Sequence, residues 1–257
     1  MYNKGLTAAT VSVYLSAVRS LHVMAGLPEP VIRTPQVKLA VRAIASIGPP
    51  PKKKAPITYD LLCKMINMLT TFPEGEMWSA VLSLAFFGGL RGSEYMGQNG
   101  STAPVVGQVQ IGYDNIMHFT VTRSKTTTHG YTIPLGCSKK RVCALCLMVE
   151  YLNVRKKVRS YRVSDWLFVY SNGNRVTKEH LNVLLRSLAK KLGLNAQDYS
   201  THSIRAGAAT TAALSGFSDW EIQRIGGWKS ETYRQYIRNL DGHVVKFAAR
   251  LAGGLAD

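Results

Sequence analysis

The stretch GGWKSETYRQYIRNLD, residues 226–241, decides the fold. It follows THSIRAGAATTAA, residues 201–213, in which His202 and Arg205 stand three positions apart. On a helix this spacing places an imidazole and a guanidinium on one side of the first turn, where the helix N-terminus is also positive. Three positive groups of this kind favour a bound phosphate. The later stretch adds the indole of Trp228 and, further on, a tyrosine hydroxyl.

The segment from His202 to Asp241 resembles the end of the catalytic domain of the tyrosine recombinase (phage integrase) family. That family carries an arginine, a lysine in a turn of its sheet, a His-x-x-Arg pair, a histidine or tryptophan, and a nucleophilic tyrosine. Counterparts stand here in the same order, and the resemblance implies the catalytic set Arg91, Lys125, His202, Arg205, Trp228 and Tyr236. Within GGLRGSEY, residues 88–95, Glu94 matches an acidic residue that supports the site. We expect Glu94 to orient His202 or a helix terminus.

The identity of the nucleophile is open between two tyrosines. The gap from Trp228 to Tyr236 is one residue shorter than the family usually shows, which makes Tyr233 a rival. We prefer Tyr236, because the sequence around it matches the family and Tyr233 would shorten the gap further.

Hydrophobic periodicity predicts a mainly helical chain with one small sheet. Alternating, β-branched runs at residues 106–111, 117–122 and 131–135 predict a three-stranded antiparallel sheet. Helical patterns fill most of the remaining chain, beginning with residues 6–25 behind a Thr7 cap. The fold class is therefore α+β, and the resemblance implies the tyrosine recombinase catalytic-domain fold.

The resemblance also predicts the domain organisation. Residues 1–47 resemble part of the family's helical (SAM-like) core-binding domain, with a second helix expected at 35–47. GPPPKKKAP, residues 48–56, combines prolines with three lysines and indicates an extended linker. Residues 57–257 would form the catalytic domain. Two helices cannot form a stable domain alone. We therefore expect this pair either to dock on the residues that follow or to be part of an N-terminal domain whose first helices are missing.

The charge balance indicates a polyanionic partner. Lysine and arginine number 32 against 15 acidic residues, so the formal net charge is +17. Double-stranded DNA is the first candidate and an anionic membrane the second. The membrane is disfavoured because no apolar run is long enough to span it and no signal segment opens the chain. We expect an intracellular protein of a cytoplasm, nucleoid or nucleus, with these residues on DNA: Arg19, Lys52, Lys53, Lys54 and Arg123.

Cysteine usage fits a reducing compartment, since four cysteines are too few for a disulfide scaffold. Cys137, Cys143 and Cys146, with His129 nearby, could form a zinc cluster, but only one Cys-x-x-Cys pair is present. We favour thiols packed in a helix core, and predict no metal and no cofactor.

The resulting hypothesis is a site-specific recombinase or integrase, for example of a mobile element, that cuts and rejoins DNA through a 3′-phosphotyrosine at Tyr236. Two alternatives remain: a recombinase-like module that binds DNA without cutting it, and a type IB topoisomerase. An apolar face over residues 242–255 predicts a C-terminal helix. The resemblance implies that this helix docks on a neighbouring subunit, giving a tetrameric ring on DNA. The other interpretation is packing onto its own domain.

Overall fold

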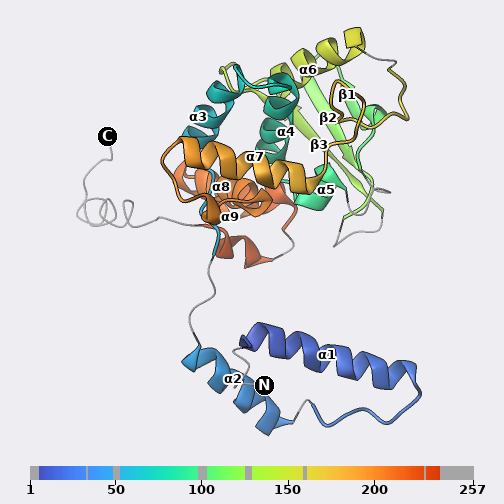
Figure 1. Cartoon of the computed structure of the whole chain (residues 1–257), viewed down its shortest axis with the longest axis vertical. Coiled ribbons are helices and arrows are strands. Elements are labelled where there is room, and N and C mark those ends of the chain that lie inside the picture. Colours follow the sequence, from blue (N-terminus) through green and yellow to red (C-terminus); the bar gives the residue numbers. More distant parts are fainter. Residues whose placement is uncertain are drawn as a thin grey trace, which may run out of the picture. The chain divides into compact units, whose positions relative to one another are not determined.

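The computed structural model describes residues 6–32, 34–48, 53–97, 103–124, 129–158, 161–228 and 230–237. Contacts divide the chain into two units, Met1–Lys53 and Lys54–Asp257 (Figure 1). Three sequence predictions, for Lys52, Lys125 and the tail 242–255, fall outside the described residues.

The first unit contains two helices, α1 (Ala8–Met24) and α2 (Pro35–Ile47), as predicted. Thr7 and Thr34 cap them by accepting main-chain N–H groups. Val11 is the one fully buried side chain described in these helices. The apolar face of α1 is otherwise exposed, at Val13, Tyr14, Val18 and Leu21 among others. The pair therefore has no hydrophobic core of its own in the described part.

The second unit is built around α4 (Gly75–Phe87), which is buried along nearly its whole length and contacts α3, α6 and α8. A helix buried on all sides forms the centre of a core rather than its surface. The surrounding helices are α3 (Tyr59–Leu69), α5 (Gly92–Met96), α6 (Ala144–Val158), α7 (Lys178–Lys191), α8 (Thr201–Leu214) and α9 (Asp219–Gly226).

The sheet is the predicted antiparallel meander, in the order β1 (Val109–Ile111), β2 (Ile116–Val121) and β3 (Tyr131–Gly136). Alternate residues of β2 are buried, at Met117, Phe119 and Val121, which gives the sheet its core face. The first strand is shorter than predicted because residues 106–108 form a 3₁₀ turn. There Gln108 accepts the Val105 N–H at 2.7 Å and donates to the Thr120 carbonyl at 2.6 Å.

A close backbone crossing fixes α8, the helix that carries the His-x-x-Arg pair. The Ile57 N–H donates to the Ser203 carbonyl at 2.8 Å. A Cβ at Gly207, on the next turn of α8, would lie 1.7 Å from the Ile57 carbonyl oxygen. Glycine is therefore required at this position, because any side chain would push the segment before α3 away from the helix.

Candidate active site

Arg91 is held by a buried carboxylate. It precedes α5, and its main-chain N–H donates to Glu94 Oε2 at 2.6 Å while its Nη1 donates to Oε1 at 2.9 Å. Ser124 Oγ donates to the same Oε1 at 2.8 Å and accepts from Arg91 Nη1 at 3.3 Å. The Glu94 side chain is fully buried, whereas that of Arg91 is 23% exposed. Glu94 thus caps α5 and orients Arg91, which is the helix-terminus alternative of the sequence prediction and not the His202 alternative.

Arg205 is buried on α8 and joins two other segments. Its Nη1 donates to the carbonyl of Gly89 and its Nη2 to the carbonyl of Gly226 at 2.8 Å. Burial lowers the pKa of Arg205, and the nearby charge of Arg91 lowers it further. The charge of Arg91 therefore acts on Arg205 across the site. The buried Arg205 Nε has no hydrogen-bond partner within the described ranges.

Two aromatic rings face the Arg205 guanidinium. Its Cζ lies 4.1 Å from the ring centroid of Trp228 and 5.7 Å from that of Tyr236. The Trp228 and Tyr236 centroids are 5.7 Å apart. The indole Nε1 of Trp228 is buried and, among the residues described, has no hydrogen-bond partner. A Cβ at Gly226 would lie 2.0 Å from Trp228 Cζ3, so the glycine that ends α9 makes room for this ring.

The two candidate nucleophiles occupy different surroundings. Tyr233 is 1% exposed, and its hydroxyl accepts from Arg234 Nε at 3.4 Å. Burial raises the pKa of Tyr233, and the Asp219 carboxylate raises it further against the opposing effect of Arg234. Tyr236 is half-buried, lies over Arg205, and contributes to the charge environment of that guanidinium. Among the described residues, Tyr236 is thus the candidate whose ring lies against Arg205.

His202 lies in the first turn of α8 and reaches solvent. Its pKa is lowered by desolvation, and then by the positive charges of Lys178 and Arg205. A lowered pKa keeps the imidazole neutral near pH 7, so it has a nitrogen that can accept a proton. His202 therefore belongs to the same electrostatic group as Arg205.

Two further residues near the site were not predicted from the sequence. Tyr131, the first residue of β3, lies near Glu94; burial and that carboxylate raise the pKa of Tyr131, while Arg205 and Arg91 oppose the shift. Lys178, the first residue of α7, lies near His202 and near Gly92 of α5. Tyr131 could have been found, since it begins the strand that follows the segment containing Lys125 in the sequence. No sequence signal pointed to Lys178.

The residues predicted to bind DNA are spread over both units. In the first unit Arg19 pairs with Glu29, with Nε and Oε1 2.5 Å apart, and Lys53 is exposed. In the second, Arg123 is exposed and Lys54 Nζ donates to the Gln197 carbonyl at 2.5 Å. Lys54 thus helps to anchor the start of its unit. Of the residues of this unit that were predicted to bind DNA, Arg123, which follows β2, is the exposed one.

Comparison with solved structures identifies the fold as that of tyrosine recombinases. The XerA recombinase is 18% identical, with 95% of this chain and 82% of that chain covered and a TM-score of 0.59. The XerH site-specific recombinase, in a post-cleavage complex with palindromic difH substrate, is 15% identical, with 96% and 68% covered and a TM-score of 0.68. The Tn1549 transposon integrase, with circular intermediate DNA, is 15% identical, with 96% and 81% covered and a TM-score of 0.63. Identities this low establish a shared fold alone.

The sequence profile of the phage integrase family matches residues 57–243. The chain therefore belongs to the phage integrase family, as the motifs predicted. No curated protein matches the chain in a sequence search. No helix in the described part of the chain is long and apolar enough to cross a membrane.

Proposed function

We propose that this chain is a site-specific DNA recombinase that cuts and rejoins DNA strands through a covalent bond to Tyr236. One observation carries the proposal: the Arg205 guanidinium faces both Trp228 and Tyr236 while lying within electrostatic range of Arg91. Positive groups and a phenol meet at one place, as attack on a phosphodiester requires.

The first step is transfer of a phosphoryl group to the phenol. The Tyr236 oxygen attacks phosphorus, a new P–O bond forms, and the bond from phosphorus to the 5′ oxygen breaks. Negative charge grows on the two non-bridging oxygens, and Arg91 and Arg205 stabilise it. The unpartnered Arg205 Nε and Trp228 Nε1 are two further buried donors suited to those oxygens. Rejoining is the reverse reaction and conserves the bond energy.

Proton transfer completes the chemistry. The phenol loses its proton as it attacks, and neutral His202 is the base that we assign to it. The leaving 5′ oxygen gains a proton, and we assign that role to Lys125, from the family's pattern. Lys178 adds a positive charge beside His202, which favours the neutral imidazole.

Binding of the substrate rests on the basic surface. The net charge of +17 and the exposed Lys53 and Arg123 suit the phosphate backbone of double-stranded DNA. The relatives XerH and Tn1549 integrase are described in complexes with DNA. We also propose that this chain forms a head-to-tail tetramer on DNA, in which the tail of each subunit, residues 242–255, docks on the neighbouring subunit.

A nicked suicide substrate tests the proposal, because loss of the fragment beyond the nick traps the phosphotyrosine. Incubation with a library of candidate sites should give a DNA adduct that survives denaturing electrophoresis. Tyr236→Phe keeps the ring but removes the hydroxyl, and should abolish the adduct. Tyr233→Phe is the matched control and should retain it.

The opposite pattern, loss with Tyr233→Phe and retention with Tyr236→Phe, would overturn the assignment of the nucleophile. DNA binding without an adduct in the unmodified chain would instead support the non-cutting binding module. Relaxation of supercoiled DNA without any site preference would support a topoisomerase.

A further inference from the structure

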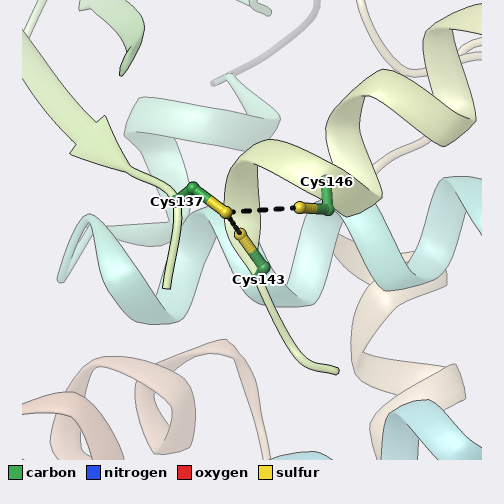
Figure 2. A group of neighbouring side chains, drawn as sticks. All are labelled: Cys137, Cys143 and Cys146. Carbon is green, nitrogen blue, oxygen red and sulfur yellow. Dashed lines mark hydrogen bonds between the residues drawn. The ribbon is translucent and has the colours of Figure 1, made fainter. Parts of the chain in front are cut away.

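Three of the four cysteines converge at one end of the sheet. Cys137 directly follows β3, Cys143 directly precedes α6, and Cys146 lies in the first turn of that helix. The Sγ atoms of Cys137 and Cys146 are 3.7 Å apart, and those of Cys137 and Cys143 are 3.9 Å apart (Figure 2). All three sulfurs lie within 4.8 Å of one another.

These separations fit a shared metal ion. A tetrahedral zinc ion with Zn–S bonds of about 2.3 Å holds its sulfurs about 3.8 Å apart. A disulfide requires about 2.05 Å, so no pair in the cluster is at bonding distance. The packed-thiol interpretation describes only Cys143, since Cys146 is exposed and Cys137 is half-buried.

The surrounding loop holds the sulfurs in place and offsets their charge. The Ser138 N–H donates to Cys143 Sγ at 3.4 Å, and Ser138 Oγ donates to the Val142 carbonyl at 3.2 Å. Such N–H···S contacts orient a ligating sulfur and stabilise its negative charge. Three thiolates and one dication leave a net charge of −1. Three consecutive cations, Lys139 to Arg141, are exposed in the same loop and compensate for it.

We propose that Cys137, Cys143 and Cys146 form a zinc site that ties the end of β3 to the start of α6. Thiolate ligands favour a soft or borderline ion such as Zn²⁺ over Mg²⁺ or Ca²⁺. Among the described residues, no histidine, carboxylate or further cysteine joins these three as a fourth ligand, so the proposed site does not include His129. A water molecule would complete the tetrahedral coordination of the zinc ion.

The position of this site has a structural consequence. β3 is an edge strand, paired only with β2 in the described sheet, and its first residue, Tyr131, lies near Glu94. A metal ion at the other end of β3 would fix the strand against the helical core. It would thereby limit movement of Tyr131 and of the rest of β3.

Metal content measured on the full chain tests the site. The chain, with any affinity tag removed, is kept reduced with a phosphine, loaded with ZnCl₂, desalted and analysed by plasma mass spectrometry. We expect about one zinc ion per chain, with three thiolate ligands. Replacement by Co²⁺ should give the intense sulfur-to-cobalt charge-transfer absorption of thiolate ligation.

Cys146→Ser is the decisive variant, because Cys146 is exposed and its replacement leaves the core intact. It should lower the zinc content at least tenfold and weaken the charge-transfer band. Cys63→Ser is the matched control, since Cys63 lies on α3 outside the cluster, and it should change neither. A chelator should lower the melting temperature of the unmodified chain, but not that of Cys146→Ser.

Three results would overturn the proposal. The first is a reduced chain that retains no zinc after desalting. The second is zinc binding that Cys146→Ser leaves intact, or that Cys63→Ser removes equally. The third is a chain that binds no metal and, without reductant, loses two hydrogen atoms in mass and two free thiols; this would identify the cluster as a disulfide pair.

Discussion

Two arginines of like charge, Arg91 and Arg205, interact electrostatically in the site, and the contacts of each explain how the chain holds it there. Arg91 is compensated by the buried Glu94 carboxylate, and Arg205 by two main-chain carbonyls and the faces of two aromatic rings. A cation over an aromatic ring contributes about 0.5–2 kcal/mol, depending on its desolvation. The arrangement leaves guanidinium donors available for a phosphate, which would relieve the remaining repulsion.

Replacing Glu94 with glutamine tests this balance. Glu94→Gln keeps the shape of the side chain but removes the charge that faces Arg91, so we expect the free energy of unfolding to fall by about 1–3 kcal/mol. Urea unfolding measures it. Glu150→Gln, on the exposed surface of α6, is the control and should change stability by less than about 0.5 kcal/mol. Equal effects of the two variants would contradict the role assigned to Glu94.

The titration of His202 gives a second prediction. Since its pKa is lowered in the folded chain, the folded state binds fewer protons than the unfolded state between the two pKa values. The free energy of unfolding is therefore highest above the ordinary histidine pKa. It falls as the pH drops from that value through the lowered pKa of His202 in the folded chain. Proton NMR should place the titration midpoint of His202 below the ordinary histidine pKa.

Lys178→Gln should move the His202 midpoint upward, because it removes one of the positive charges that disfavour the imidazolium. Lys190→Gln, at the other end of α7, is the control and should leave the midpoint unchanged. A midpoint that does not respond to Lys178→Gln would show that desolvation alone lowers the pKa.

At the scale of elements, the site depends on how closely α8 is approached by its neighbours. The segment before α3 crosses it at Gly207, and Arg205 links it to the turn after α4 and to the end of α9. Three segments from separate parts of the sequence thus meet around one helix. Their close approach explains why small residues occur at the crossings.

Gly207→Ala tests the crossing. In an ordinary helix interior, alanine is more favourable than glycine by about 1 kcal/mol. Here the new Cβ would lie 1.7 Å from the Ile57 carbonyl oxygen, so we expect a loss of about 1–3 kcal/mol in urea unfolding. Gly136→Ala is the control, because no heavy atom lies within 4 Å of its Cβ position. A stabilising Gly207→Ala would show that the segment before α3 moves freely.

The elements were largely predictable, and the contacts between them were not. Period-two and helical patterns gave the three strands and the first two helices, because burial of one face leaves a local signature. Motif order gave Arg91, Arg205 and Tyr236 as candidates. Nothing local revealed Lys178, because its position near His202 depends on α7 and α8 folding together. The spacing of Cys137, Cys143 and Cys146 did raise a zinc cluster, although packed thiols were favoured. Of the two roles expected for Glu94, the structure shows the capping of a helix terminus and not the orientation of His202.

At the scale of the whole molecule, the positive charge sets how the chain meets its substrate. Each phosphate that a lysine or arginine neutralises releases counterions, so log K for DNA binding falls linearly with log salt by about 0.9 per contact. With a net charge of +17, we expect a steep dependence. A flat dependence would contradict a phosphate-based interface.

Arg123→Gln should reduce that salt slope by about 1, because Arg123 is exposed beside the sheet and is predicted to contact a phosphate. Fluorescence anisotropy at several salt concentrations measures it. Lys190→Gln, exposed on α7, is the charge-matched control and should leave the slope unchanged. Equal changes in both variants would indicate a diffuse effect of charge instead of a contact.

The site of covalent attachment tests the central claim most directly. Trypsin cuts after Lys229, Arg234 and Arg238, so Tyr233 and Tyr236 fall on separate peptides, residues 230–234 and 235–238. The trapped DNA adduct is digested with nuclease and trypsin and analysed by mass spectrometry. The account predicts the nucleotide remnant on peptide 235–238. A remnant on peptide 230–234, or on any peptide without Tyr236, would contradict it.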